Sequence, residues 1–264
     1  MSEVESPPAG AISKERRFGV AISSALILGG GWWAAAEMTE AKGTDTLEYP
    51  VSGASVVVDA RDADVEVRSG DVSQITVTRK TERNVFSSDP EEKYEGGRLE
   101  LRKTGCGFLS FGTCDTNYLI VVPREVAVRA ESSSGDLTAA ELLKGVDLRT
   151  TSGSIEVRSV GGDVQLKTSS GGVEGQELAD GRYVIEVSSG DIDLRFRQPP
   201  ASVDAESSSG DVSIEVPAGD QAYAVDADTS SGDTESQLKQ DPCAERKIRA
   251  KSSSGDVLLE YADN

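Results

Sequence analysis

The stretch SVDAESSSGDVSIEV, residues 202–216, places apolar residues at alternate positions on both sides of a serine-glycine-aspartate turn. Alternation with a period of two sends successive side chains to opposite faces of a β-strand. The stretch therefore predicts a strand, a tight turn and a second strand, each with an apolar and a polar face. The same pattern surrounds seven glycines, namely Gly135, Gly153, Gly171, Gly190, Gly210, Gly232 and Gly255.

These glycines define a repeat of about 20 residues, because their spacings are 18, 18, 19, 20, 22 and 23. The position three before each glycine is serine or threonine except at Val187, and the position just before is always serine. Such columns indicate that equivalent positions of different repeats stack on one another. The position seven before each glycine is always large and apolar, namely Val128, Val146, Val164, Tyr183, Val203, Val225 and Ile248.

The repeat predicts an all-β fold, a single-stranded β-solenoid (β-helix) of stacked coils. A unit with two short strands cannot bury its apolar face alone, whereas stacking at about 4.8 Å pairs each backbone with the coils above and below. Glycine suits the corner because it accepts a positive φ. The stacked serine and threonine hydroxyls are expected to hydrogen-bond along their column.

Upstream of the first glycine the alternation is less regular, which we interpret as the terminal, capping part of the stack. Short apolar runs at residues 56–58 and 65–67 predict strands, and Ser69-Gly70-Asp71 repeats the corner motif. The polar stretch 81–94 is predicted to be a loop. The solenoid domain is therefore predicted to span residues 47–264.

Residues 18–36, FGVAISSALILGGGWWAAA, carry no charge for 19 positions. A helix needs about 20 apolar residues to cross a bilayer, so this run is predicted to be a transmembrane helix. The alternative is a signal peptide cleaved after Ala36, because Ala34-Ala35-Ala36 fits a small-residue cleavage rule. Two tryptophans at the outer end favour a retained anchor.

The charges beside this run predict the orientation of the chain. Lys14, Arg16 and Arg17 precede the run, and the positive-inside rule then places residues 1–17 in the cytoplasm as a disordered tail. Residues 37–46 are interpreted as a linker. The C-terminal domain is therefore expected outside a cell membrane that the chain crosses once, or secreted if the segment is cleaved.

At these aligned residues the chain resembles the bacterial β-strand-repeat adhesin domain of unknown function, also called the head GIN domain. The resemblance extends from about residue 47 to 261 and includes Val121-Val122-Pro123-Arg124 before the first Ser-Ser-Ser-Gly-Asp. It implies a solenoid, exposure at the cell surface and no known enzyme activity. The chain departs from the pattern at Ser154 and Gly172, where aspartate is typical, and at Thr234, an apolar position.

The overall charge narrows the classes of partner. The chain has a net charge of −19, and all of this excess lies after residue 36, where 43 acidic and 24 basic residues remain. Such a field repels phosphate backbones, so nucleic acid is excluded as a partner. Histidine is absent, which removes serine-histidine, cysteine-histidine and histidine-ligated metal chemistry. No cofactor is expected.

Three cysteines fall in the exported part. Cys106 and Cys114 bracket the loop CGFLSFGTC and are predicted to form a disulfide, because thiols tend to oxidise outside the membrane. Cys243 remains and is interpreted as an inert thiol.

Aspartates recur directly after the corner glycines at Asp136, Asp191, Asp211, Asp233 and Asp256. Neighbouring carboxylates repel, so each aspartate is expected either to cap its own turn by accepting backbone N–H groups or to belong to a row of weak Ca²⁺ sites. The chain lacks the GGxGxDx pattern of calcium-binding β-rolls, which favours the capping role.

Taken together, these features favour a non-catalytic module for binding, adhesion or scaffolding in the cell envelope. Its partner would be an envelope or cell-surface protein or glycan. Two alternatives remain, a calcium-dependent surface β-roll and a polysaccharide-acting β-helix enzyme. The enzyme would need long loops and aromatic sugar platforms, whereas the predicted turns are short.

Overall fold

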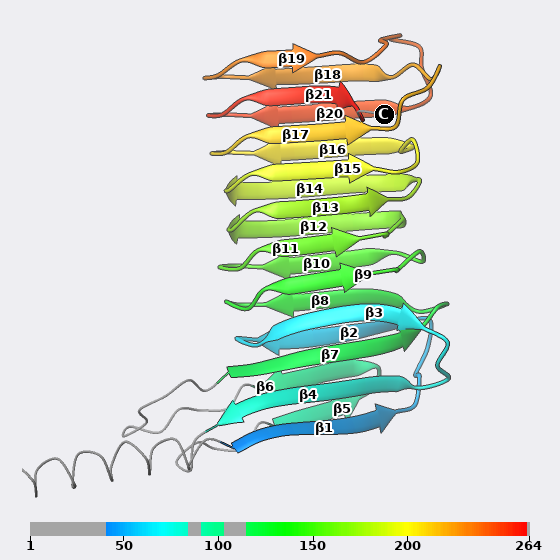
Figure 1. Ribbon diagram of the computed structural model, residues 1–264, viewed down its shortest axis with the longest axis vertical. Coiled ribbons are helices and arrows are strands. Elements are labelled where there is room, and N and C mark those ends of the chain that lie inside the picture. The colour runs from blue at the N-terminus through cyan, green and yellow to red at the C-terminus, as the bar shows by residue number, and fades with distance from the viewer. Residues whose placement is uncertain (1–40, 84–90, 103–114, 263–264) are drawn as a thin grey trace, which may run out of the picture. The chain divides into compact units, whose positions relative to one another are not determined.

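The computed structural model describes residues 41–83, 91–102 and 115–262. In this part of the chain every regular element is a β-strand, and no helix is long and apolar enough to cross a membrane. The run predicted as a transmembrane helix lies outside the described residues. Residues 42–264 group into one compact unit, in which the strands form two sheets around one apolar core (Figure 1).

The first sheet has eleven strands among the described residues. In spatial order they are β1 (Ala41–Tyr49), β4 (Ile75–Arg83), β7 (Asp115–Pro123), β3 (Asp64–Gly70), β9 (Leu137–Ala140), β11 (Ile155–Arg158), β13 (Val173–Leu178), β15 (Ile192–Phe196), β17 (Val212–Val216), β21 (Val257–Tyr261) and β19 (Thr234–Ser236).

The second sheet has ten strands in the same part of the chain. In spatial order they are β18 (Ala224–Thr229), β20 (Lys247–Ser252), β16 (Ser202–Ser207), β14 (Gly181–Ser189), β12 (Gly162–Ser170), β10 (Val146–Thr150), β8 (Ala127–Ser132), β2 (Ser55–Arg61), β6 (Arg98–Arg102) and β5 (Glu91–Glu95).

The predicted columns are confirmed in register. Each coil contributes one strand to each sheet, and Val146 of β10 pairs with Val128 on one side and Val164 on the other. The strands are parallel, as stacked coils require. Inward residues of these columns are buried, and each fully buried valine or leucine stabilises the stack by roughly 1.5 to 3 kcal/mol.

The last two coils stack out of chain order. β20 pairs with β16 on one side and with β18 on the other, so coil β20–β21 lies between coils β16–β17 and β18–β19 (Figure 1). The two coils differ in their apolar content, since Thr234 of β19 occupies the position that Val257 occupies in β21. The more apolar coil takes the inner place, where burial is more complete.

The N-terminal end is not a simple continuation of the solenoid. Coil β2–β3 lies between coil β8–β9 and the strands β6 and β7, while β4 runs antiparallel to β7 and β5 antiparallel to β6. The predicted loop at 81–94 is therefore wrong at both ends, since β4 continues to Arg83 and β5 begins at Glu91. β1 likewise begins within the predicted linker 37–46.

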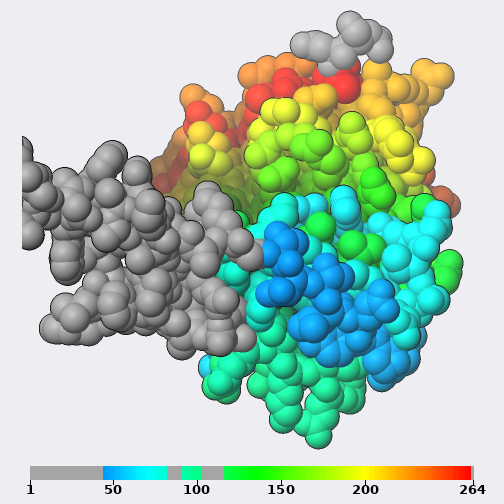
Figure 2. Space-filling model, turned by 60° about the horizontal axis from the view of Figure 1, so that its bottom comes forward, coloured from blue at the N-terminus to red at the C-terminus, as the bar shows by residue number. Residues whose placement is uncertain are grey.

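The alternation of apolar residues does not reveal β1, β5 and the end of β4, because some of their inward positions are polar. Nη1 of Arg79 donates to both carboxylate oxygens of Glu92 at 2.8 and 3.0 Å, and its Nη2 donates to Asp45 at 2.6 Å. The Tyr118 hydroxyl also donates to Glu92, at 3.1 Å, and burial raises its pKa. This cluster and β1, blue in Figure 2, lie at the N-terminal end of the stack.

Candidate functional site: the serine corner and its groove

The corner glycines stack in a column along one edge of the solenoid. Gly171, Gly190, Gly210, Gly232 and Gly255 have φ between +134° and +147°, a region that residues with a side chain rarely adopt. The predicted positive φ is therefore confirmed at these five positions. Gly135 and Gly153 do not adopt it, so a second reason must hold there.

The second reason is the close approach of neighbouring coils. A Cβ atom on Gly210 would lie 2.5 Å from the carbonyl carbon of Gly190, and one on Gly135 would lie 2.5 Å from that of Ala63. All seven corner glycines face a backbone carbonyl of the adjacent coil in this way. The motif is thus architectural, because any side chain would push the coils apart.

Side-chain hydroxyl groups donate hydrogen bonds to the backbone carbonyls of the corner glycines. Three residues before five of the corners, a serine or threonine donates its hydroxyl to the glycine carbonyl of the neighbouring coil, which confirms hydrogen bonding along the predicted column. Ser132 donates instead to the carbonyl of Arg61 at 2.7 Å. Val187 interrupts this series. The bonds are Thr150 to Gly135 at 3.2 Å, Thr168 to Gly153 at 2.9 Å, Ser207 to Gly190 at 3.1 Å, Ser252 to Gly210 at 2.9 Å and Thr229 to Gly255 at 2.8 Å.

The aspartates cap the neighbouring coil, not their own turn as predicted. Oδ1 of Asp211 accepts the backbone N–H of Asp256 at 2.8 Å, and Oδ1 of Asp256 accepts that of Asp233 at 2.8 Å. The same bond joins Asp191 to the N–H of Asp211 and Asp136 to the N–H of Ser154. Stacking explains the difference, because a coil spacing brings the next turn's N–H within reach of each carboxylate.

The corner of the first coil was misplaced by the sequence pattern. Ala63 and Asp64 occupy it, and Oδ1 of Asp64 accepts the N–H of Asp136 at 2.9 Å. Ser69-Gly70-Asp71 lies instead at the far end of β3, where Gly70 pairs with Pro123. The corner of this coil carries no glycine, so the motif gives no signal there.

The aspartate column does not gather metal ligands. Within residues 41–83, 91–102 and 115–262, no group of three or more acidic or cysteine side chains could hold a metal ion. The five bonds above engage one oxygen each of Asp64, Asp136, Asp191, Asp211 and Asp256, and the coils with Ser154 and Gly172 supply no carboxylate at this position. Hydrogen bonding to the neighbouring coil therefore gives these five aspartates a structural role.

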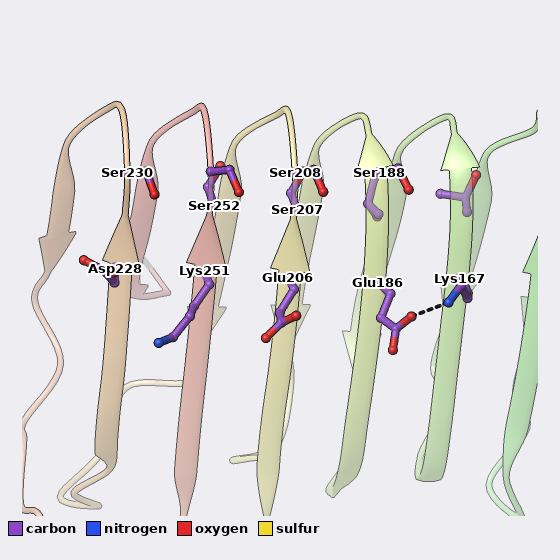
Figure 3. Close-up of a pocket in the computed structure, with 13 residues that line it drawn as sticks. Lys167, Glu186, Ser188, Glu206, Ser207, Ser208, Asp228, Ser230, Lys251 and Ser252 are labelled. Atoms are coloured by element: carbon purple, nitrogen blue, oxygen red, sulfur yellow. Dashed lines mark hydrogen bonds and ion pairs between the residues drawn. The ribbon is translucent and has the colours of Figure 1, made fainter.

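A shallow groove of about 390 Å³ runs beside the corner on the outer face of the ten-stranded sheet (Figure 3). It crosses β12, β14, β16, β20 and β18. One side is a row of charged residues four positions before the corner glycines, and the other is a row of hydroxyls two positions before them. These rows are Lys167, Glu186, Glu206, Lys251 and Asp228, and Ser188, Ser208, Ser253 and Ser230.

Sequence reasoning missed this groove, although a signal was present. The position two before the corner glycine is serine or threonine in all seven repeats, and these side chains are exposed. A hydroxyl that recurs at an outward position serves neither the core nor the carbonyl bonds described above. Repetition at exposed positions is therefore the feature that marks a surface.

The charges along the groove are largely held in ion pairs. Nζ of Lys167 lies 2.5 Å from Oε2 of Glu186, and Glu206 lies 2.7 Å from Nη2 of Arg249. Lys251 lies 3.3 Å from Asp226. These pairs are exposed, so each is worth at most about 1 kcal/mol and stays available for exchange with a ligand's charges.

The groove lacks the features of a hydrolytic site. It is open along its length, and its acidic side chains are spread one per coil along a row (Figure 3). A glycosidase needs two carboxylates on opposite sides of the scissile bond. The groove therefore suits a ligand that lies along the surface better than one that is enclosed and cleaved.

The opposite edge of the solenoid absorbs the variation in repeat length. The paired residues on the two sides of the corner keep one spacing, whereas the far connections vary in length, from residues 179–180 to residues 237–246. Cys243 lies in this last connection and is exposed. Cys106 and Cys114, predicted to form a disulfide, lie outside the described residues.

The chain is similar to several solved structures. A protein described as a candidate adhesin from Parabacteroides distasonis is 9% identical with a TM-score of 0.52, over 83% of this chain and 97% of that one. A candidate adhesin from Bacteroides fragilis is 11% identical with a TM-score of 0.47, over 84% of this chain and 98% of that one. A candidate lipid-binding protein from P. distasonis is 14% identical with a TM-score of 0.41, over 84% of this chain and 97% of that one. At 9% identity the likeness to the first of these structures shows the fold alone.

The sequence comparison is more direct. No curated protein matches the chain. Residues 54–264, however, match the family described as Toastrack DUF4097, and this range contains the corner column and the groove. The match supports a β-repeat domain, while the narrower head GIN assignment stays a prediction. The chain belongs to the Toastrack DUF4097 family.

Proposed function

We propose that this protein is a non-catalytic binding module that displays the corner groove to an extended partner, an envelope or cell-surface protein or glycan. The observation that carries the proposal is the repetition of outward-facing groups. Five neighbouring strands present the same two rows, charged and hydroxyl, at a constant interval. A partner with its own regular repeat would meet a hydroxyl at the same place on each coil, beside a charged residue whose sign varies along the row.

The structure also explains why such a surface would hold its shape. The corner backbone is fixed by glycine packing, by hydroxyl bonds to carbonyls and by aspartate bonds to N–H groups, all beside the groove. A preorganised surface loses little conformational entropy on binding. Adhesion and scaffolding both need such a rigid face.

A pair of matched variants tests this role. Ser208 lies in the groove, and Ser213 lies on the outward face of β17 in the same coil. A photo-crosslinking residue at position 208, introduced into the full-length chain in cells, should give discrete adducts with a surface protein or glycan. The same residue at position 213 should give none. Equal adducts from both positions, or none from position 208, would contradict a groove-centred function.

The location proposed for this module is the outside of a cell membrane, with residues 18–36 as the anchor. The uncharged run and the preceding Lys14, Arg16 and Arg17 support it. Protease added to intact cells should then digest the solenoid and spare an epitope tag placed before residue 14. Full protection of the solenoid would refute this orientation.

A further inference from the structure

The C-terminal end of the stack leaves an open edge on the last strand of each sheet, β19 and β18, and that of β18 is the longer. β18 pairs with β20 on one side, and its other side has no strand partner among the described residues. Val225 and Ala227 of β18 are only partly buried, whereas their counterparts Ile248 and Ala250 on β20 are 1% and 0% exposed. Part of the core therefore lacks the coil that would cover it.

Residues 239–241 begin to pair along this open edge, at Tyr223, but the pairing does not continue. The N–H of Tyr223 donates to the carbonyl of Lys239 at 3.0 Å, and the N–H of Asp241 donates to the carbonyl of Tyr223 at 3.0 Å, in a parallel bridge centred on Gln240. The segment then turns away, because the N–H of Cys243 donates to Oδ1 of Asp241 at 2.9 Å.

The alternation of backbone groups identifies which ones face the open side. Ala224 and Ser230 donate their N–H groups toward β20, to Arg246 and Ser252 at 2.9 and 3.2 Å. Adjacent residues of a strand direct their backbone groups to opposite sides, so Val225 and Ala227 direct theirs outward. In the described part of the chain these groups have no backbone partner. They form a template for one more strand.

The side chains around this edge define the chemistry of that strand. Asp226 and Asp228 point outward from β18, and residues 224–236 contain no lysine or arginine. Asp226 already pairs with Arg249 at 3.7 Å and Lys251 at 3.3 Å on β20, whereas Asp228 has no basic side chain within ion-pair distance among the residues described. A hollow of about 430 Å³ next to β18 is lined by the apolar Ala224, Val225, Pro242 and Ile248, and also by Asp226, Gln240, Lys247 and Arg249.

We propose that the open edge of β18 binds an extended basic peptide of a partner protein, which adds as a further strand. Its basic side chains would lie opposite Asp226 and Asp228, and its alternate small apolar side chains would cover Val225 and Ala227. This site shares Asp228 with the end of the corner groove, but the backbone edge of β18, Val225 and Ala227 lie outside the groove lining, so it does not depend on the function proposed for the groove.

A second copy of this chain fits the edge less well. Pairing β18 with β18 of another copy would place Asp226 and Asp228 against aspartates, and like charges directly opposite destabilise a strand pair. The edge strand at the other end, β5, carries Glu91, Glu92 and Glu95 against one lysine, so end-to-end pairing would also bring acidic edges together.

The test uses the full-length chain and a fluorescent seven-residue peptide of alternating lysine and valine. Its controls are the same peptide with glutamate for lysine, and one of the same composition with the lysines in one block. Anisotropy should show saturable binding of the alternating peptide, at least tenfold tighter than of either control. Equal binding of the block peptide would show charge attraction alone and overturn the proposal.

Two variants locate the site. Proline is tolerated where a strand N–H faces outward, so Ala227→Pro should remove an edge donor and weaken binding at least tenfold with little change in melting temperature. Asp228→Lys should weaken the lysine peptide and strengthen the glutamate peptide. Glu174→Lys makes the same charge change on β13, an inner strand, and should alter affinity less than twofold.

The outcomes separate this proposal from its rivals. If Ala227→Pro fails to fold, the peptide affinities of Asp228→Lys and Glu174→Lys still test the site. Equal changes in affinity for these two variants would overturn the edge site. Ser208→Arg, in the middle of the groove, should leave peptide affinity unchanged, so the groove function and this one fail independently. A dimer in sedimentation equilibrium that Ala227→Pro or Asp228→Lys dissociates would instead assign the edge to a second copy.

Discussion

The carbonyl group of Gly190 occupies the space that a side chain on Gly210 would need. A Cβ atom on Gly210 would lie 2.5 Å from the carbonyl carbon of Gly190 and closer still to its oxygen. Because the neighbour is backbone, no side-chain movement can relieve the clash. The φ of Gly210, +144°, adds a second penalty for any other residue.

Gly210→Ala should therefore destabilise the protein by more than about 2 kcal/mol, through strain and displaced coils. Gly219→Ala is the matched control, since its Cβ would meet only the flexible side chain of Gln221, and it should cost less than about 0.5 kcal/mol. Denaturant unfolding of both variants measures the difference. Similar stability of the two would show that the corner does not require glycine.

Val187→Thr should complete the hydroxyl column. Val187 is paired in register with Thr168 and Ser207, and a threonine there would have the carbonyl of Gly171 as its acceptor. A buried valine-to-threonine change usually costs about 1 to 3 kcal/mol, because the hydroxyl loses water. We expect Val187→Thr to cost less than about 0.5 kcal/mol and Val203→Thr, in the apolar column, to cost the usual amount. Equal losses in thermal unfolding would contradict the column.

Asp211→Asn and Asp211→Ala separate hydrogen bonding from charge. Asparagine keeps an oxygen for the N–H of Asp256 and relieves repulsion from neighbouring aspartates, so its effect on the free energy of unfolding should be under about 0.5 kcal/mol. Alanine removes the acceptor and should cost about 1 kcal/mol. A loss as large with asparagine as with alanine would assign the role to charge.

The same proteins test the calcium row. With carboxylates engaged on backbone N–H groups, we expect no more than a degree of difference between the melting temperatures of the wild type in millimolar Ca²⁺ and in chelator. Ligand binding to the folded state raises this temperature. A rise that Asp211→Asn reduces would establish a cation site.

Cys106 and Cys114 should be joined in protein that has passed through an oxidising compartment. The short loop between them would then stabilise the fold by roughly 2 to 3 kcal/mol. Peptide mapping without reductant should recover one cross-linked species, and Cys243 should react with a thiol reagent without unfolding. Two unmodified thiols at 106 and 114 would refute the pairing.

The solenoid could be predicted because its core is repetitive. Val146, Val164 and Tyr183 lie at a fixed distance from their corner glycines, and the structure stacks them in that register. At the N-terminal end, β2 and β3 were predicted from residues 56–58 and 65–67. β1, β5 and the end of β4 could not be predicted, because inward positions such as Arg79 and Glu92 are polar and satisfy each other only in the folded state. The aspartate bonds were predicted in kind but assigned to the wrong turn, since a sequence motif carries no information about the neighbouring coil.

The exchange of the last two coils has a consequence for how the chain assembles during synthesis. Coil β18–β19 is synthesised first, yet the strands with which it pairs, β20 and β21, lie in residues 247–261 and leave the ribosome later. Before β20 is made, β18 could pair with the exposed edge of β16, which has a similar alternation of residues. Such a non-native pair would be a kinetic trap, because β20 has to take the place between β16 and β18. Truncation before residue 247 would leave this coil without the strands with which it pairs and accessible to proteolysis, which gives quality-control proteases a direct way to distinguish unfinished chains.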